Sequence, residues 1–111
     1  MNLHNHVLLI GNLGGDPELK SFENGTKVLN VSMATNESYK DSKGERQTKT
    51  DWHRLVIFGK QAELIAEHCK SGSKLAIEGK LQTRSYEQDK TKRYITEVVV
   101  QEFIFLDTKK S

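Results

Sequence analysis

The sequence predicts an all-β fold, a small Greek-key barrel of five strands with one short helix between the third and fourth strands. Short segments rich in apolar or alternating residues recur along the chain and are separated by polar loops. One segment changes instead to helical spacing. With 111 residues the chain has room for a single domain, which we place at residues 1–106, followed by a short polar end at 107–111.

The first two predicted strands lie before residue 40. Leu3–Ile10 is dense in Leu, Val and Ile, which predicts a strand. The glycine-rich residues 11–17 predict a bend or bulge, because they lack the Gly-Lys-Ser/Thr ending and the following helix of a phosphate-binding loop. The Asn-Gly pair at 24–25 predicts a hairpin turn. Apolar and polar residues then alternate from Leu29 to Met33, as in a half-buried strand.

The middle of the chain predicts a loop, a strand and the helix. Residues 40–50 are polar and charged and predict a long flexible loop at the tip of a hairpin. Trp52–Phe58 predicts the third strand. From residue 60 to 69 the apolar spacing is that of one helical face, formed by Ala62, Ile65, Ala66 and Cys69. Gly72 is predicted to end this helix.

Two further strands complete the predicted barrel. Lys74–Thr83 is the fourth, with Gly79 easing a bend, and Tyr94–Leu106 is the fifth. A polar loop at residues 85–93 joins them. The predicted buried side of the fourth strand carries Leu75, Ile77 and Leu81. This order of strands and helix is the layout of an OB-fold barrel.

Positive charge is concentrated in two segments. Residues 40–60 and 80–93 each carry a net charge of +3, whereas the whole chain carries +2, so the remainder is acidic. The two segments coincide with the loops through which OB-fold barrels bind oligonucleotides. Together they predict a positive face for a polyanion, and two merely solvated loops are the alternative.

The third strand presents an unusual outer face. Alternation places one set of residues on one side, Trp52, Arg54, Val56 and Phe58, and the other set on the opposite side, His53, Leu55 and Ile57. With the aliphatic side in the core, the rings are free to stack on unpaired bases and the guanidinium to reach a phosphate. The inverted alternative puts both rings in the core, but it also buries Arg54, which is costly without a partner.

Two tyrosines lie in similarly basic and polar surroundings. Tyr39 precedes the first basic segment, and Tyr86 is in strand phase with Lys80 and Arg84. Basic residues interleaved with exposed rings are typical of a surface that binds single-stranded nucleic acid.

Further motifs lie in several stretches of the chain, at residues 7–14 with 16–18, 34–39, 51–60, 77–84 and 94–100. They include Trp-His-Arg and Phe-Gly-Lys within 51–60 and Glu-Gly-x-Leu-x-Thr-Arg at 78–84. These stretches resemble the bacterial-type single-stranded DNA-binding protein family, for which the three short motifs together are highly specific. The resemblance implies an OB-fold homotetramer that binds and protects single-stranded DNA without sequence preference during replication, recombination and repair.

The resemblance also implies the residues that contact DNA. The stacking residues are Tyr39, Trp52, Phe58 and Tyr86, and the basic contacts are Arg54, Arg84 and Lys60, with Lys80, Lys43 and Lys49. Many relatives carry Trp at the two tyrosine positions, which implies a smaller stacking area here. The family's acidic tail, which recruits replication and repair proteins, is not supported by the end of this sequence at residues 107–111. We expect either a naturally short member or a shortened chain.

Other function classes find little support. No apolar run is long enough to cross a bilayer, and the first residues lack the pattern of a secretory signal, which predicts a soluble intracellular domain. Together with the family resemblance, this implies a cytoplasmic, nucleoid-associated protein. His4, His6 and the single Cys69 do not form a ligand set, so we predict no metal, cofactor or enzymatic activity. His53 is expected to pack or to contact another subunit. Binding of RNA, or of a protein partner alone, stays open as an alternative.

Overall fold

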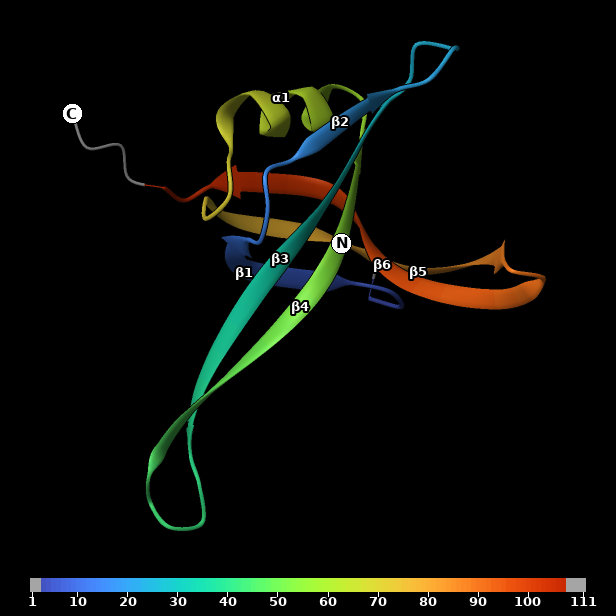
Figure 1. Ribbon diagram of the computed structural model, residues 1–111. Helices are drawn as coiled ribbons and strands as arrows, with labels where there is room; N and C mark the ends of the chain where they lie inside the picture. The colour runs from blue at the N-terminus through green and yellow to red at the C-terminus, as the bar shows by residue number, and fades with distance from the viewer. Residues whose placement is uncertain (1–2, 108–111) are drawn as a thin grey trace.

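The computed structural model describes residues 3–107, which form six strands and one helix (Figure 1). In chain order these elements are β1 (Val7–Leu13), β2 (Glu18–Ser21), β3 (Lys27–Lys40), β4 (Arg46–Phe58), α1 (Lys60–His68), β5 (Lys74–Gln88) and β6 (Thr91–Phe105). The sheet runs in the order β1-β5-β6-β4-β3, and it closes because β1 also pairs with β3. The predicted OB-fold barrel is confirmed, with β2 as an added strand on β3.

The barrel closes at two places. β4 and β6 run parallel, with Leu55 opposite Val98, whereas the other pairings are antiparallel. β1 leaves β5 at Asn12 and joins β3 there. A Cβ on the neighbouring Gly11 would lie 2.2 Å from the carbonyl oxygen of Ala34, so only glycine permits this close approach. The bend expected in the glycine-rich stretch is therefore confirmed, since β1 and β2 follow the same edge of β3 with a break between them.

The core lies between the barrel wall and α1. Its largest fully buried side chains are Leu29, Met33, Leu55, Ile57, Ile65, Leu75 and Ile77. The predicted apolar face of α1 is confirmed, because Ala62 and Ile65 are fully buried. The helix ends at His68, however, where the next residue takes an extended conformation. Gly72 lies further on, in a turn where its N–H donates to the carbonyl of Leu13, so its predicted role as the helix end was wrong.

Two hairpins extend beyond the barrel as two-stranded ribbons, β3–β4 and β5–β6, which point in different directions (Figure 1). Residues 40–50 and 85–93, which we expected to be loops, belong largely to these ribbons. Pairing continues to Lys40 opposite Arg46 in one ribbon and to Gln88 opposite Thr91 in the other. Backbone hydrogen bonds hold the strands together here without buried apolar side chains, which is why the sequence pattern failed to show the strands.

Tight turns close both ribbons. In the β3–β4 turn, the Asp41 carboxylate accepts hydrogen bonds from the backbone N–H groups of Lys43 and Glu45, each at 2.9 Å. In the β5–β6 turn, Asp89 and Lys90 both have positive φ, at 52° and 64°, as a type I′ turn requires.

The first strand and the middle of β5 differ from the prediction. β1 begins at Val7 instead of Leu3. Before β1, the side chain of Asn5 makes the two hydrogen bonds that a strand backbone would make with Leu81. Its amide nitrogen donates to the carbonyl of Leu81 at 2.9 Å, and its amide oxygen accepts from the Leu81 N–H at 2.8 Å. Leu81 itself is half-exposed, because it lies beyond Gly79, where β5 leaves the core. Its predicted burial was wrong, whereas that of Leu75 and Ile77 is confirmed.

Candidate nucleic-acid interface

The phase predicted for the strand that carries Trp52 is confirmed. The Trp52 side chain is 62% exposed and Phe58 is exposed too, whereas Leu55, at 1%, lies in the core. Arg54 is exposed on the same face as the two rings, whereas Val56, which alternation also places there, is buried at 7%. His53 points the other way, half-buried, and its Nε2 is 2.9 Å from the hydroxyl oxygen of Thr35. The inverted strand, with the rings in the core, is therefore excluded.

The backbone of the glycine-rich stretch supports the indole. A Cβ on Gly14 would lie 2.2 Å from Cζ3 of Trp52, so the ring rests where glycine leaves room. Across the β3–β4 pair, Trp52 is opposite Ala34 and Arg54 is opposite Ser32. These short side chains leave the ring and the guanidinium accessible above the sheet. Gly14 was not among the predicted site residues, since its part depends on a contact between residues far apart in sequence.

The register places Tyr39 on a different face from Trp52. Tyr39 pairs with Gln47 and has the strand phase of Met33, which is in the core. It is exposed only because β3 has left the barrel at this point. Lys49 shares this phase, and its Nζ lies 3.9 Å from a carboxylate oxygen of Asp51.

The other predicted residues lie at separate places. Lys43 is in the turn of the β3–β4 ribbon, and Lys60 is exposed at the start of α1, two residues after Phe58. On β5, Lys80, Arg84 and Tyr86 alternate along one face and are exposed, as expected.

A polar hollow of about 370 Å³ joins the two basic segments. It brings together Arg54 from β4 and Arg84 from β5, and adds Lys20 from β2. Its other lining residues are Asn30, Val31, Ser32, Leu55 and Glu97. Lys20 was missed because β2 has no apolar alternation that predicts a strand. With three cations facing one carboxylate, the hollow suits an anion.

Glu97 is the acidic member of this hollow. It is only 4% exposed, and its Oε1 accepts a hydrogen bond from Nε of Arg84 at 2.8 Å. Sequence reasoning missed it, since nothing in an alternating strand distinguishes an outward glutamate from a buried one. Within residues 3–107, no group of His, Cys, Asp and Glu is arranged to hold a metal ion, and no helix is long and apolar enough to cross a membrane.

A closed OB-fold barrel that exposes aromatic rings beside a cationic hollow defines a class of proteins that hold single-stranded nucleic acid. Over residues 4–106 the sequence matches the Single-strand binding protein family. The chain belongs to this family. It is 45% identical over 109 residues to single-stranded DNA-binding protein 1 of Chlorobaculum tepidum. The aligned region covers 96% of this chain and 67% of that relative. The family binds DNA without catalysis, so the chain is not an enzyme.

Solved structures agree with this assignment. The fold is similar to that of a Plasmodium falciparum SSB in complex with ssDNA, with a TM-score of 0.85 and 34% identity over 96% of this chain and 97% of that one. It is also similar to a deletion mutant of the single-stranded DNA-binding protein from Thermus aquaticus, with a TM-score of 0.82 and 27% identity. That match covers 93% of this chain and 50% of the Thermus aquaticus chain.

Proposed function

We propose that this chain binds single-stranded DNA without sequence preference, stacking bases on its exposed rings and neutralising phosphates at its basic residues. The observation that carries the proposal is the surface at Trp52, where a largely exposed indole rests on Gly14 beside the exposed Arg54. Every base has a face that stacks on an aromatic ring, so such a surface is indifferent to sequence. The relatives described above are named for the same ligand.

The proposed contacts divide into two groups. The rings are Trp52, Phe58, Tyr86 and Tyr39, and the cations are Arg54, Arg84, Lys60, Lys80, Lys43 and Lys49, to which the hollow adds Lys20. Because Tyr39 and Lys49 face the other side of the β3–β4 ribbon, they would meet DNA only where the strand passes around that ribbon. We assign this binding to residues 1–106 and expect it to serve replication, recombination and repair in the cytoplasm, at the nucleoid.

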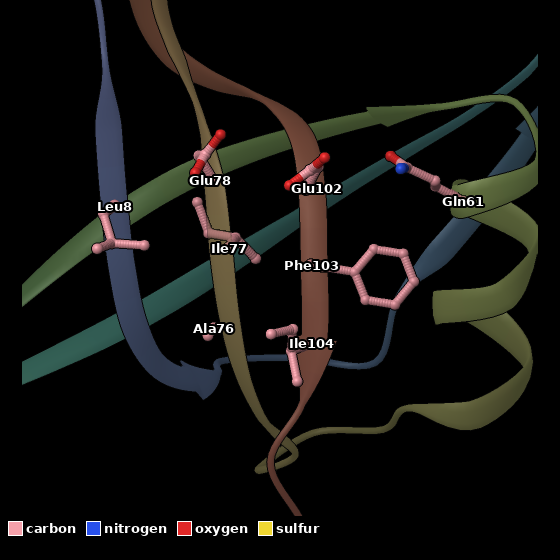
Figure 2. A pocket seen from close by; sticks show the side chains of 8 residues that line it. All are labelled: Leu8, Gln61, Ala76, Ile77, Glu78, Glu102, Phe103 and Ile104. Carbon is pink, nitrogen blue, oxygen red and sulfur yellow. The ribbon is translucent and has the colours of Figure 1, made fainter. Parts of the chain in front are cut away.

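The proposal includes self-association into a homotetramer. The outer face of β1, β5 and β6 carries exposed aliphatic side chains, with Leu8 and Ile104 each 64% exposed and Ile10 in the same row as Ile104. A shallow pocket of about 310 Å³ opens on this face, beside the paired carboxylates of Glu78 and Glu102 (Figure 2). Within the described part of the chain, β1 pairs on one edge only from residue 7 to 11. A second copy would cover both the apolar face and the open edge.

The test is a titration of fluorescein-labelled poly-dT, followed by anisotropy, against a duplex of the same length. Stacking requires free base faces, so the duplex should bind far more weakly. The logarithm of the association constant should fall linearly as the logarithm of the salt concentration rises, with a slope of about −0.7 per phosphate neutralised. Equal affinity for the duplex and the single strand at moderate salt would contradict the proposal. A matched RNA oligomer separates DNA binding from the RNA alternative.

A further inference from the structure

The hollow between the two basic segments contains the carboxylate of Glu97, although a site that binds phosphates would be expected to be lined by cations alone. Among residues 3–107, Glu97 is the one charged side chain that is buried. A buried carboxylate is costly unless it is paired and hydrogen-bonded. It also opposes the binding of any phosphate in a hollow that it shares with Lys20, Arg54 and Arg84. A purely electrostatic account therefore gives Glu97 an unfavourable part in DNA binding.

The register explains which groups surround this carboxylate. On one side, Leu55 of β4 pairs with Val98, so Arg54 and Glu97 are the residues immediately before that pair. On the other side, Gln82 of β5 is opposite Glu97, and Arg84 is its diagonal neighbour on the same face. Glu97 thus lies between arginines from two different strands. Its ion pair is with Arg84, through Nε and Oε1 at 2.8 Å.

The geometry of this ion pair leaves Arg84 able to bind a second anion. A guanidinium has five N–H donors, and the hydrogen bond to Glu97 uses the one on Nε. The Arg84 side chain remains 52% exposed, so the ion pair with Glu97 does not enclose it. An arginine on an exposed strand otherwise loses considerable rotamer entropy when it contacts a ligand. Fixing its Nε beforehand reduces that loss.

We propose that Glu97 is a positioning residue for DNA binding. It holds the guanidinium of Arg84 in the hollow beside Arg54 and Lys20, so that this guanidinium is already oriented when a backbone phosphate binds. This role rests on the single-stranded DNA binding proposed above. It predicts the opposite sign from a purely electrostatic role. Removing the hydrogen-bond acceptor weakens binding, even though the hollow becomes more positive.

Two substitutions separate the acceptor from the charge. Glu97→Gln keeps an oxygen that accepts from Nε but removes the negative charge, and Glu97→Met keeps the length of the side chain but removes the acceptor. In titrations of labelled poly-dT, Glu97→Gln should bind at least as tightly as the parent. Glu97→Met should bind about threefold to tenfold more weakly, the amount that one hydrogen bond contributes. If Glu97→Met binds as tightly as Glu97→Gln, the positioning role is wrong.

An Arg84→Ala background supplies the matched control. Without a guanidinium to hold, Glu97→Gln and Glu97→Met should bind equally in that background. An unchanged difference between them would mean that Glu97 acts through the fold instead. Titrations are made well below the melting temperature of each variant. Failure of the parent to bind poly-dT would refute the proposed function itself, whereas parent binding with a tight Glu97→Met refutes only the positioning role.

The order of the Arg84 side chain can also be measured directly in the unaltered protein, so this test does not require any variant to fold. ¹⁵N relaxation of the arginine Nε–H groups reports how far each guanidinium is ordered before DNA is added. Arg84 should be clearly more ordered than Arg93, which lies on the same ribbon with no ion pair among the described residues. Equal mobility of the two side chains in the free protein would overturn the proposal.

Discussion

Replacement of Trp52 by alanine tests the central claim that the outer face of β4 stacks on bases. The ring is 62% exposed and its covered part rests on Gly14, so folding loses little when it is removed. We expect a decrease of at most about 1 kcal/mol in the free energy of unfolding, as for other surface positions. DNA binding should lose one base–aromatic stack, about 1–3 kcal/mol, which corresponds to roughly 5-fold to 150-fold in affinity.

Leu55→Ala is the matched control on the opposite face of the same strand. Leu55 is 1% exposed, so its truncation leaves a cavity in the core and should cost about 2–5 kcal/mol of stability. The protein that remains folded should bind DNA nearly as the parent does. Arg54→Ala supplies the third variant, with nearly intact folding and a salt slope shallower by about 0.7 if one phosphate contact is lost.

Each variant needs a thermal melt and a titration of labelled poly-dT at two salt concentrations. Anisotropy of a labelled oligomer is required, because Trp52 is the only tryptophan and its substitution removes the tryptophan fluorescence that would otherwise report binding. The reasoning is refuted if Trp52→Ala binds like the parent. It is refuted equally if Leu55→Ala, fully folded, loses as much affinity as Trp52→Ala.

Three further predictions concern assembly, the support of the indole and the β3–β4 turn. Light scattering with size exclusion should give four chain masses for the parent and a smaller particle for Ile104→Glu, which places a charge on the apolar outer face; a parent of single-chain mass would contradict the tetramer. Gly14→Ala should displace the Trp52 ring and weaken poly-dT binding, whereas Gly15→Ala, whose Cβ would meet nothing within 4 Å, should not. Hydrogen bonds to Asp41, first that from the Glu45 N–H, outweigh desolvation and hold the pKa of its carboxyl below the usual 3.8. The stabilisation of the turn by the ionised Asp41 carboxylate is therefore fully present above pH 3.8 and is lost as the pH falls through the lowered pKa. An NMR titration of Asp41 with a midpoint at or above 3.8 would contradict this prediction.

Much of the barrel was predictable because burial follows alternation wherever one face of a strand meets the core. Leu55 and Ile57 on one side and Trp52 on the other could be assigned from period two together with the cost of burying Arg54, and Ala62 and Ile65 from helical spacing. The extended ribbons could not. Their strands have polar residues on both sides, and the hydrogen bonds that pair them leave no mark on side-chain composition.

The candidate site was predictable in its residue types but not in its grouping. Charge distribution indicated the two basic segments, and Arg54 and Arg84 do line one hollow. Tyr39 was placed with Trp52 because a predicted loop carries no strand phase, and only the observed register assigns it to the other face. Glu97 and Lys20 depend on which strands become neighbours, which is a property of the closed barrel and not of any local pattern.

The way the barrel closes also bears on how the chain folds. The two ribbons join residues near in sequence across short turns, such as Gln88 with Thr91, and hairpins of this kind form within microseconds. Assembly of the barrel from these hairpins instead pairs Val7 with Gly79, and Leu55 with Val98, across long intervening segments that must first lose conformational entropy. Refolding is therefore expected to be limited by the docking of β1 and β6, with both hairpins already paired when the core finally excludes water.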